Sequence, residues 1–362
     1  MTVEFTHVTL GQRVLFGAGL AREGLAGELA RLGARRPLIL AGDRERAMAE
    51  QVVGGLEESA GVERLSWHGD VAMHVPVDVA ERARAAAAAA EADVVVAVGG
   101  GSTTGLAKAV ALTTGLPIIA VPTTFAGSEA TNVWGMTEDG RKTTGVDDAV
   151  LPASIVYDAE LTASLPPAMA VASGLNALAH CVDSLWAPRA DPINGALAAE
   201  GARALSAGLP LLHRDPDADA GREQVLYGAY LAAVAFASAG SGLHHKICHV
   251  LGGAYDLPHA ETHAVVLPHV LAFNGPAAPA AQRRLAEAFG SDSAMSGLAA
   301  LYDAVDAPSA LADHGMAAAD IPAAARLVAA VVPDSNPRPA AERQLVGLLT
   351  AAQNGDRAAW GL

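Results

Sequence analysis

The first part of the chain alternates short apolar runs with helix-length stretches in which charged residues recur. Apolar runs with little polar alternation predict strands that are buried on both faces. Because helical patterns separate these runs, the sequence predicts a doubly wound parallel sheet with helices on both sides. The runs are Val14–Phe16, Pro37–Ala41, Asp93–Val98, Leu116–Val121 and Ser154–Tyr157.

The pattern changes after about Asp158, where strand-like runs become scarce and helical periodicity dominates. We therefore predict two domains: an α/β Rossmann-like dinucleotide-binding domain over residues 1–160 and an all-helical catalytic domain over residues 161–362. A length of 362 residues agrees with this division, since single cores stop growing at roughly 250–300 residues. The predicted helices include Ala168–Trp186, Pro192–Leu212, Arg222–Ala239 and Lys246–Leu251.

Composition and charge narrow the setting. Hydrophobic residues make up 51% of the chain, which is enough for a large core. The formal net charge of −15 argues against binding to nucleic acid or to an anionic membrane surface. Two cysteines, Cys181 and Cys248, do not make a disulfide framework and favour a reducing compartment. With no signal-peptide pattern and no membrane-length apolar run, we expect a cytoplasmic protein.

Two loops follow predicted strands and have the character of a nucleotide site. Gly99–Ser102 lies between the run Asp93–Val98 and a helical pattern, where backbone N–H groups and the helix dipole attract anions. The segment Pro122–Glu129 follows the next run and carries hydroxyl groups. Each loop alone is also typical of a capped turn, but the two together favour NADH or NADPH. The candidate cofactor residues here are Gly100, Gly101, Ser102, Thr123, Thr124 and Phe125.

The loop after Pro37–Ala41 bears on the choice of nicotinamide cofactor. Asp43 can accept a hydrogen bond from an adenosine ribose hydroxyl, which favours NADH. If Gly42 occupies that position instead, Arg44 and Arg46 are free to meet a 2′-phosphate. The sequence leaves this choice open.

Six of the chain's 12 histidines lie between His244 and His269. His245 and His249 are four residues apart and share one face of a helix. His259 follows a proline that interrupts regular structure. Imidazoles in this arrangement can bind a metal, transfer protons or hold an anion. For His244 and His269 we favour the alternative, a core histidine satisfied by backbone partners.

A second polar pair lies earlier in the predicted helical domain. Asn176 and His180 are four residues apart, so they face the same way on a helix. Together with His245 and His259 they can form one polar site facing the nucleotide loops.

The order of four motifs, VGGGS, PTTFAGSE, SGLNALAH and HHKICHVLGGAYDLPHAETHA, resembles the iron-containing (group III) alcohol dehydrogenase superfamily. The resemblance implies the dehydroquinate synthase-like fold: a nucleotide-binding α/β domain, a helical domain and a catalytic cleft between them. It also places Lys142 where the superfamily has a lysine near the cofactor. In metal-dependent members an aspartate and three histidines hold Fe²⁺ or Zn²⁺. Those positions fall on Asn176, His180, His245 and His259.

Two departures from the superfamily pattern resemble its maleylacetate reductase branch. Asn176 replaces the metal-binding aspartate, and Gly105 replaces the aspartate that usually follows the glycine loop. The resemblance to that branch implies reduction of maleylacetate to 3-oxoadipate with NADH or NADPH in aromatic-compound catabolism, without a tightly bound metal. Arg338, in an NPRP segment also found in the branch, is either a structural turn or a partner for a substrate carboxylate.

The chemistry of that reaction agrees with the residues. Hydride addition to the alkene gives an enolate, so the site needs donors for two carboxylates and for the enolate oxygen, and an acid to protonate carbon. The alternatives are a metal-dependent alcohol dehydrogenase of the same superfamily and a non-redox, lyase-type sugar-phosphate cyclase, against which Asn176 counts. We expect a homodimer acting on a small dicarboxylate. The predicted catalytic residues are His249, His259, His245, Lys246, Asn176 and His180.

Overall fold

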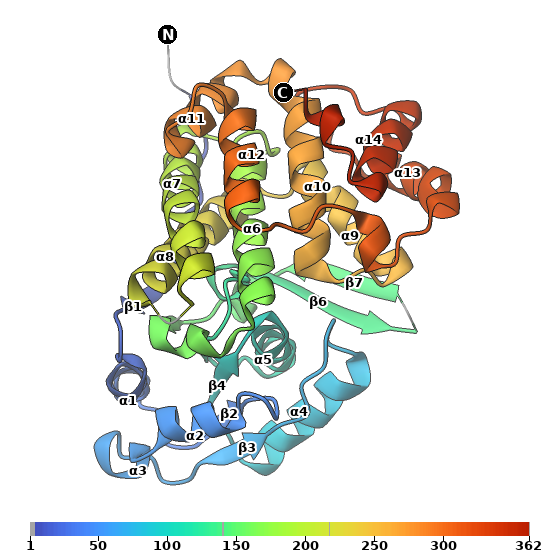
Figure 1. Ribbon diagram of the computed structural model, residues 1–362. Helices are drawn as coiled ribbons and strands as arrows, with labels where there is room; N and C mark the ends of the chain where they lie inside the picture. The colour runs from blue at the N-terminus through green and yellow to red at the C-terminus, as the bar shows by residue number, and fades with distance from the viewer. Residues whose placement is uncertain (1–3, 140, 217, 362) are drawn as a thin grey trace. The chain divides into compact units, whose positions relative to one another are not determined.

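The computed structural model describes residues 4–139, 141–216 and 218–361. The chain separates into two compact units, which we call the α/β unit and the helical unit. The α/β unit is Leu10–Leu165, and the helical unit comprises residues 4–9 and 166–361. Figure 1 colours the first unit mainly blue to green and the second green to red. That these units act as a dinucleotide-binding domain and a catalytic domain stays a proposal.

The α/β unit is built on a six-stranded sheet in which every described pairing is parallel. The doubly wound sheet predicted from the apolar runs is therefore confirmed. Its central strands are buried along their whole length. The strands, in spatial order, are β1 (Arg13–Phe16), β8 (Ser154–Tyr157), β5 (Ile118–Pro122), β4 (Val94–Gly99), β2 (Pro37–Leu40) and β3 (Ser66–His68).

Alternate residues of the central strands enter two separate cores. Ile39 and Val96 belong to a core that contains residues of α1 and α2, whereas Leu38 and Val95 belong to a core with residues of α4 and α5. Both faces of the sheet are therefore covered, which is why its strands carry so few polar residues. The helices of this unit are α1 (Ala21–Leu32), α2 (Arg46–Val53), α3 (Leu56–Ser59), α4 (Val77–Ala89) and α5 (Gly101–Thr114).

Three strands were not expected from the sequence. β3 has only three residues, and it lies at the sheet edge, where no continuous apolar run is needed. β6 (Val133–Glu138) and β7 (Arg141–Val146) form a separate antiparallel pair. Their described side chains are partly or fully exposed, with Val146 at 70%, so these residues form no buried face that would produce an apolar pattern.

The rest of the chain is helical, as predicted. α9 is longer than the predicted Lys246–Leu251 at both ends, so His244 and His245 lie in its first turn. Glycines allow close helix packing: a Cβ on Gly228 of α8 would lie 2.8 Å from Leu205 of α7. The helices are α6 (Pro167–Ser184), α7 (Pro192–Arg214), α8 (Asp219–Ala239), α9 (Leu243–Tyr255), α10 (His259–Asn274), α11 (Pro279–Phe289), α12 (Ala294–Ala304), α13 (Ile321–Ala329) and α14 (Glu342–Asn354).

No single helix in the described ranges is long and apolar enough to cross a membrane. The α8 and α9 pair passes the same test of length and composition only when taken together, and the two helices are bent by 97°.

Candidate active site

The sheet topology of the α/β unit brings the predicted cofactor loops to neighbouring strand ends. β2 and β4 are adjacent, but the chain continues outward from them in opposite directions, to β3 and to β5. Open parallel sheets bind ligands where the strand order reverses in this way. Gly42 and Asp43 follow β2, and Gly100 to Ser102 follow β4, so both predicted groups flank this point.

The glycine loop is shaped by close backbone packing. A Cβ on Gly99 would lie 2.3 Å from Thr103 Oγ1, and one on Gly100 would lie 2.8 Å from Thr124 Cγ2. The Thr123 backbone N–H donates to the Gly99 carbonyl at 3.1 Å and ties the two loops together. Gly100 is the N-cap of α5 and, among the described contacts, has no side-chain cap. The first N–H groups of α5 therefore suit a phosphate.

Not every predicted cofactor residue offers its side chain to a ligand. Thr123 and Phe125 are only 2% and 1% exposed, so their side chains support the loop, whereas Thr124 is partly exposed. The backbone of Lys142 lies in β7, but its side chain is outside the described part of the structure. The guanidinium of Arg46 stacks 3.7 Å from the Trp67 ring and pairs with a glutamate, so it is not free for a 2′-phosphate.

A buried lysine that the sequence analysis did not select supports the second loop, Pro122–Glu129. Lys108 of α5 is fully buried, and its Nζ donates to the Ser128 and Val133 carbonyls, both at 2.7 Å, and to Thr131 Oγ1 at 2.9 Å. Burial lowers the pKa of Lys108 to about 7. A charge inside an otherwise apolar stretch of α5 was the available signal.

We predict that Lys108→Met lowers the free energy of unfolding by roughly 1–3 kcal/mol, because buried acceptors lose their donor. Since those acceptors fix the second loop, the dissociation constant for NADH should rise at least about fivefold. Fluorescence titration and urea unfolding measure both effects. Arg82→Met, which removes an exposed arginine, is the control and should change neither. Unchanged NADH affinity in a destabilised Lys108→Met would mean that Lys108 supports only the core.

In the helical unit, α6 presents a polar stripe. Asn176, His180 and Asp183 are spaced at helical intervals and are 2%, 8% and 0% exposed. Within the described ranges, Asn176 Oδ1 and His180 Nδ1 are buried without a hydrogen-bond partner. Burial lowers the pKa of His180 to about 4, so its imidazole is neutral at pH 7.

His245 of α9 lies against this stripe. Its ring stacks on His180 with centroids 4.8 Å apart and planes 13° apart, and the Phe236 ring lies 4.2 Å away. Its Nδ1 is 2.8 Å from Asp183 Oδ2. Its Nε2 is buried and has no partner among the described residues. Burial lowers the pKa of His245 well below its usual value.

α10 adds two further imidazoles to the cluster. His259 is its first residue and is exposed, and His263 one turn later is fully buried, with ring centroids 4.3 Å apart. His263 lies 4.9 Å from His245 by the same measure. His249 is exposed, and its ring centroid lies 6.0 Å from that of His245. Lys246 is half-buried. The structure thus gathers the predicted histidines around His245 and adds His263, which the sequence analysis did not select.

The two histidines assigned to the core differ from each other. His244 is buried, but its Nε2 pairs with His263 Nδ1 at 2.9 Å and not with the backbone. His269 is buried further along α10, with its ring 6.1 Å from Trp360. Burial lowers the pKa of His269 to about 4.

This shift predicts a pH-dependent stability. The folded-state pKa of His269 lies below the unfolded value of 6.5, so its stability contribution is complete above pH 6.5 and is lost as the pH falls toward 4. Between pH 7 and 4.5 the natural chain should therefore lose about 2–3 kcal/mol more unfolding free energy than His269→Leu. Urea unfolding of both proteins at the two pH values tests this. Parallel pH dependences would contradict it.

Comparison with known protein families shows the family to which the chain belongs. The family model for iron-containing alcohol dehydrogenases matches residues 11–159, and the C-terminal model of the Fe-containing alcohol dehydrogenase family matches residues 170–353. The chain belongs to the iron-containing alcohol dehydrogenase family. The resemblance inferred from the four motifs is thereby confirmed. Membership makes the chain an NAD(P)-dependent oxidoreductase and favours redox chemistry over the cyclase alternative.

Individual relatives are similar over nearly the whole chain. The maleylacetate reductase of Sphingobium indicum is 44% identical over 98% of both proteins, and that of Burkholderia cepacia is 45% identical over 95% of this chain and 96% of the relative. A solved iron-containing alcohol dehydrogenase from Corynebacterium glutamicum has a TM-score of 0.95 at 56% identity and 99% coverage of both chains. The maleylacetate reductase structure from Agrobacterium tumefaciens has a TM-score of 0.92 at 41% identity, covering 98% and 100%.

The side chains at the family's metal positions are a poor set of metal ligands. Asn176, His180, His245 and His259 offer only neutral donors, and divalent cations bind weakly without an anionic ligand. The Asp183 carboxylate does not replace it, because four N–H donors and the Nδ1 atom of His245 already contact it. Among the described residues, only His244, Cys248 and His263 group three ligand atoms within 4.8 Å, and two of these are hydrogen-bonded to each other. The residues do not fit a tightly held metal.

The packing around Gly105 explains the second departure from the superfamily. A Cβ at Gly105 would lie 3.0 Å from Val75 Cγ2. Val75 follows His74, and both have left-handed backbone angles, with φ of 49° and 63°. The valine therefore occupies the space that an aspartate side chain would need.

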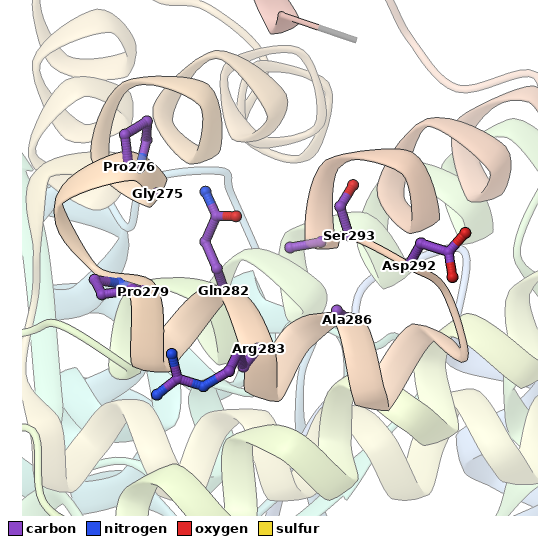
Figure 2. A pocket seen from close by; sticks show the side chains of 9 residues that line it. Gly275, Pro276, Pro279, Gln282, Arg283, Ala286, Asp292 and Ser293 are labelled. Atoms are coloured by element: carbon purple, nitrogen blue, oxygen red, sulfur yellow. The ribbon is translucent and has the colours of Figure 1, made fainter.

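Two surface pockets of the helical unit contain none of the predicted catalytic residues. One, of about 330 Å³, lies by α11, where Gln282 projects between Pro276 and Ser293 (Figure 2). The other, of about 310 Å³, includes Arg338, whose guanidinium lies 4.5 Å over the Phe273 ring. Phe273 is near the end of α10 and His259 begins it, roughly 20 Å away at 1.5 Å per residue. Arg338 is thus remote from the histidine cluster, which favours the structural-turn interpretation.

Proposed function

We propose that this chain is an NAD(P)H-dependent maleylacetate reductase, which reduces the alkene of maleylacetate to give 3-oxoadipate. The observation that best supports this function is that the four metal positions of the family hold only neutral side chains here. Additional buried imidazoles surround them. Identities of 42–46% to curated maleylacetate reductases support the same substrate. We also keep the cytoplasmic location, the homodimer and the absence of nucleic-acid or membrane partners as proposals.

The reaction balances with groups that the chain supplies. The nicotinamide delivers hydride to the alkene carbon β to the ketone, and the electron pair moves to the ketone oxygen to form an enolate. One proton from solvent then adds to the alkene carbon next to the ketone, giving 3-oxoadipate and oxidised cofactor. We assign proton delivery to His245 and orientation to Asn176 and His180. The exposed His249, His259 and half-buried Lys246 are suited to bind the two carboxylates.

A simple aldehyde or ketone usually needs a Lewis acid to polarise its carbonyl, whereas an alkene conjugated to a ketone can accept hydride without one. We therefore propose that no tightly bound metal takes part. Dialysis against EDTA should leave maleylacetate-dependent NADH oxidation at more than about half of its starting rate. Elemental analysis should find no stoichiometric iron or zinc. The alternative, a metal-dependent alcohol dehydrogenase, predicts that activity is lost with the metal and that simple aldehydes are reduced faster than maleylacetate.

Asn176→Asp is the matched variant for this test, because it restores the missing carboxylate with almost no change in volume. If His180, His245 and His259 can converge on one point, this variant should bind Zn²⁺ at least about tenfold more tightly than the natural chain by calorimetry. Equal Zn²⁺ affinity would show that the three imidazoles do not form a metal site.

The residues after β2 bear on the choice between NADH and NADPH. Asp43 is exposed after β2 and available to a ribose hydroxyl, and Arg46 is already engaged. We therefore propose NADH as the better cofactor, although Arg44 is exposed in the same loop.

A further inference from the structure

The carboxylate of Asp183 is fully buried and accepts hydrogen bonds from several groups at once. Oδ1 accepts from Trp186 Nε1 at 3.1 Å, and Oδ2 accepts from the Gly242 backbone N–H at 2.8 Å. The backbone N–H groups of His244 and His245 approach it at 3.4 Å each. Burial raises the pKa of the Asp183 carboxyl, and these donors oppose that shift.

Asp183 therefore caps a helix to which it does not belong. The N-cap of α9 is Gly242, which has no side chain to satisfy the first N–H groups. A Cβ on Gly242 would lie 2.4 Å from Asp183 Oδ1, so only glycine leaves room for the carboxylate. The positive end of the α9 dipole faces the same carboxylate.

The same oxygen that receives the Gly242 N–H also lies 2.8 Å from His245 Nδ1. Four other N–H donors already point at this carboxylate and favour its ionised form. An ionised carboxylate can only accept, so Nδ1 carries the proton of the neutral imidazole. The lone pair then resides on Nε2, which is the nitrogen without a partner among the described side chains. Stacking on His180 and contact with Phe236 hold the ring in this orientation.

We propose that Asp183 is a positioning residue that fixes His245 in the Nδ1–H tautomer, so that Nε2 exchanges the proton that reaches the substrate carbon. The carboxylate also balances the charge of His245 when Nε2 carries that proton. The proton-delivery part rests on the proposed function, whereas the tautomer does not.

The tautomer can be observed directly. In full-length protein labelled with ¹⁵N-histidine, long-range ¹H–¹⁵N correlations distinguish protonated from unprotonated ring nitrogens, and His245→Gln assigns the signal. We expect Nδ1–H in the natural chain, loss of that tautomer in Asp183→Asn, and its recovery in Asp183→Glu. An Nε2–H tautomer in the natural chain, or no change in Asp183→Asn, would overturn the proposal whether or not maleylacetate is the substrate.

Kinetics provide the second arm. Asp183→Asn should lower kcat for maleylacetate by about two to four orders of magnitude, with KM and NADH affinity within about twofold. In a His245→Ala background it should cause no further loss, because both changes remove one unit. Trp186→Phe, which removes a different hydrogen bond from the same carboxylate, should keep the tautomer and most of kcat. Additive losses in the double variant would mean that Asp183 is only a helix cap.

If the natural chain does not turn over maleylacetate, the proposed function fails and the tautomer measurement still decides the role of Asp183.

Discussion

Gly101→Val should weaken NADH and NADPH binding at least about 100-fold while leaving the protein folded. Gly101 is the first residue of α5, at the helix N-terminus where a pyrophosphate is expected, and valine places a branched side chain there. A Cβ at this position would lie 3.3 Å from the Ala126 Cβ, which a small local shift can accommodate. Fluorescence titration of both cofactors, with circular dichroism as the folding check, measures the effect.

Two further variants make this test specific. Ser102→Pro removes one backbone donor in the first turn of α5, where proline is compatible with a helix, so binding should fall about tenfold or more with little loss of helix. Gly27→Val is the matched control, because an added Cβ on this exposed glycine of α1 meets no described atom within 4 Å apart from its chain neighbours and the adjacent helix backbone. Unchanged affinity in a folded Gly101→Val would mean that the loop is merely a turn.

The second large effect concerns the histidines of the helical unit. His245→Ala should lower kcat/KM for maleylacetate by roughly two to four orders of magnitude, mainly through kcat, because its Nε2 is assigned to proton delivery. His249→Ala and His259→Ala should lower kcat/KM on the same scale but with a larger share in KM, since these exposed rings are assigned to the carboxylates. Asn176→Ala should cost less, since its assigned role is orientation.

NADH affinity should stay within about twofold in all of these variants, because the residues belong to the helical unit and not to the glycine loops. His213→Ala, in the last turn of α7, is the control and should behave as the natural chain. Near-normal turnover in the three histidine variants would show that the cluster is structural, and the proposed mechanism would then be wrong.

The fold was predictable where burial imposes a pattern. β4 and β5 are buried throughout, so their apolar runs marked them, and the glycine loop after β4 could be located from the same pattern. β3 and the β6–β7 pair were missed because partly exposed strands carry no such pattern. The start of α9 was also missed, since the donor groups of its first turn are satisfied by Asp183 from another helix and not by a local capping residue.

The site residues were predictable where they belong to an uncommon sequence pattern. Clustered histidines drew attention to His245, His249 and His259 without any structure. Asp183 is one of 39 acidic residues, and only the packing of α6 against α9 gives it a role. His263 was within reach of the sequence, because it lies one helical turn after His259. Phe236 was not, since its place beside His180 and His245 depends on how α8 packs in the folded unit.

The most direct test of the proposed function follows the transferred hydride. The purified chain is supplied with maleylacetate and NADH deuterated at the transferred position, and the product is analysed by NMR. The proposed mechanism predicts 3-oxoadipate with one deuterium on the carbon β to the ketone, next to a carboxylate, and an intact ketone. A hydroxy acid with deuterium on the former ketone carbon, or no turnover of maleylacetate with either NADH or NADPH, would contradict it.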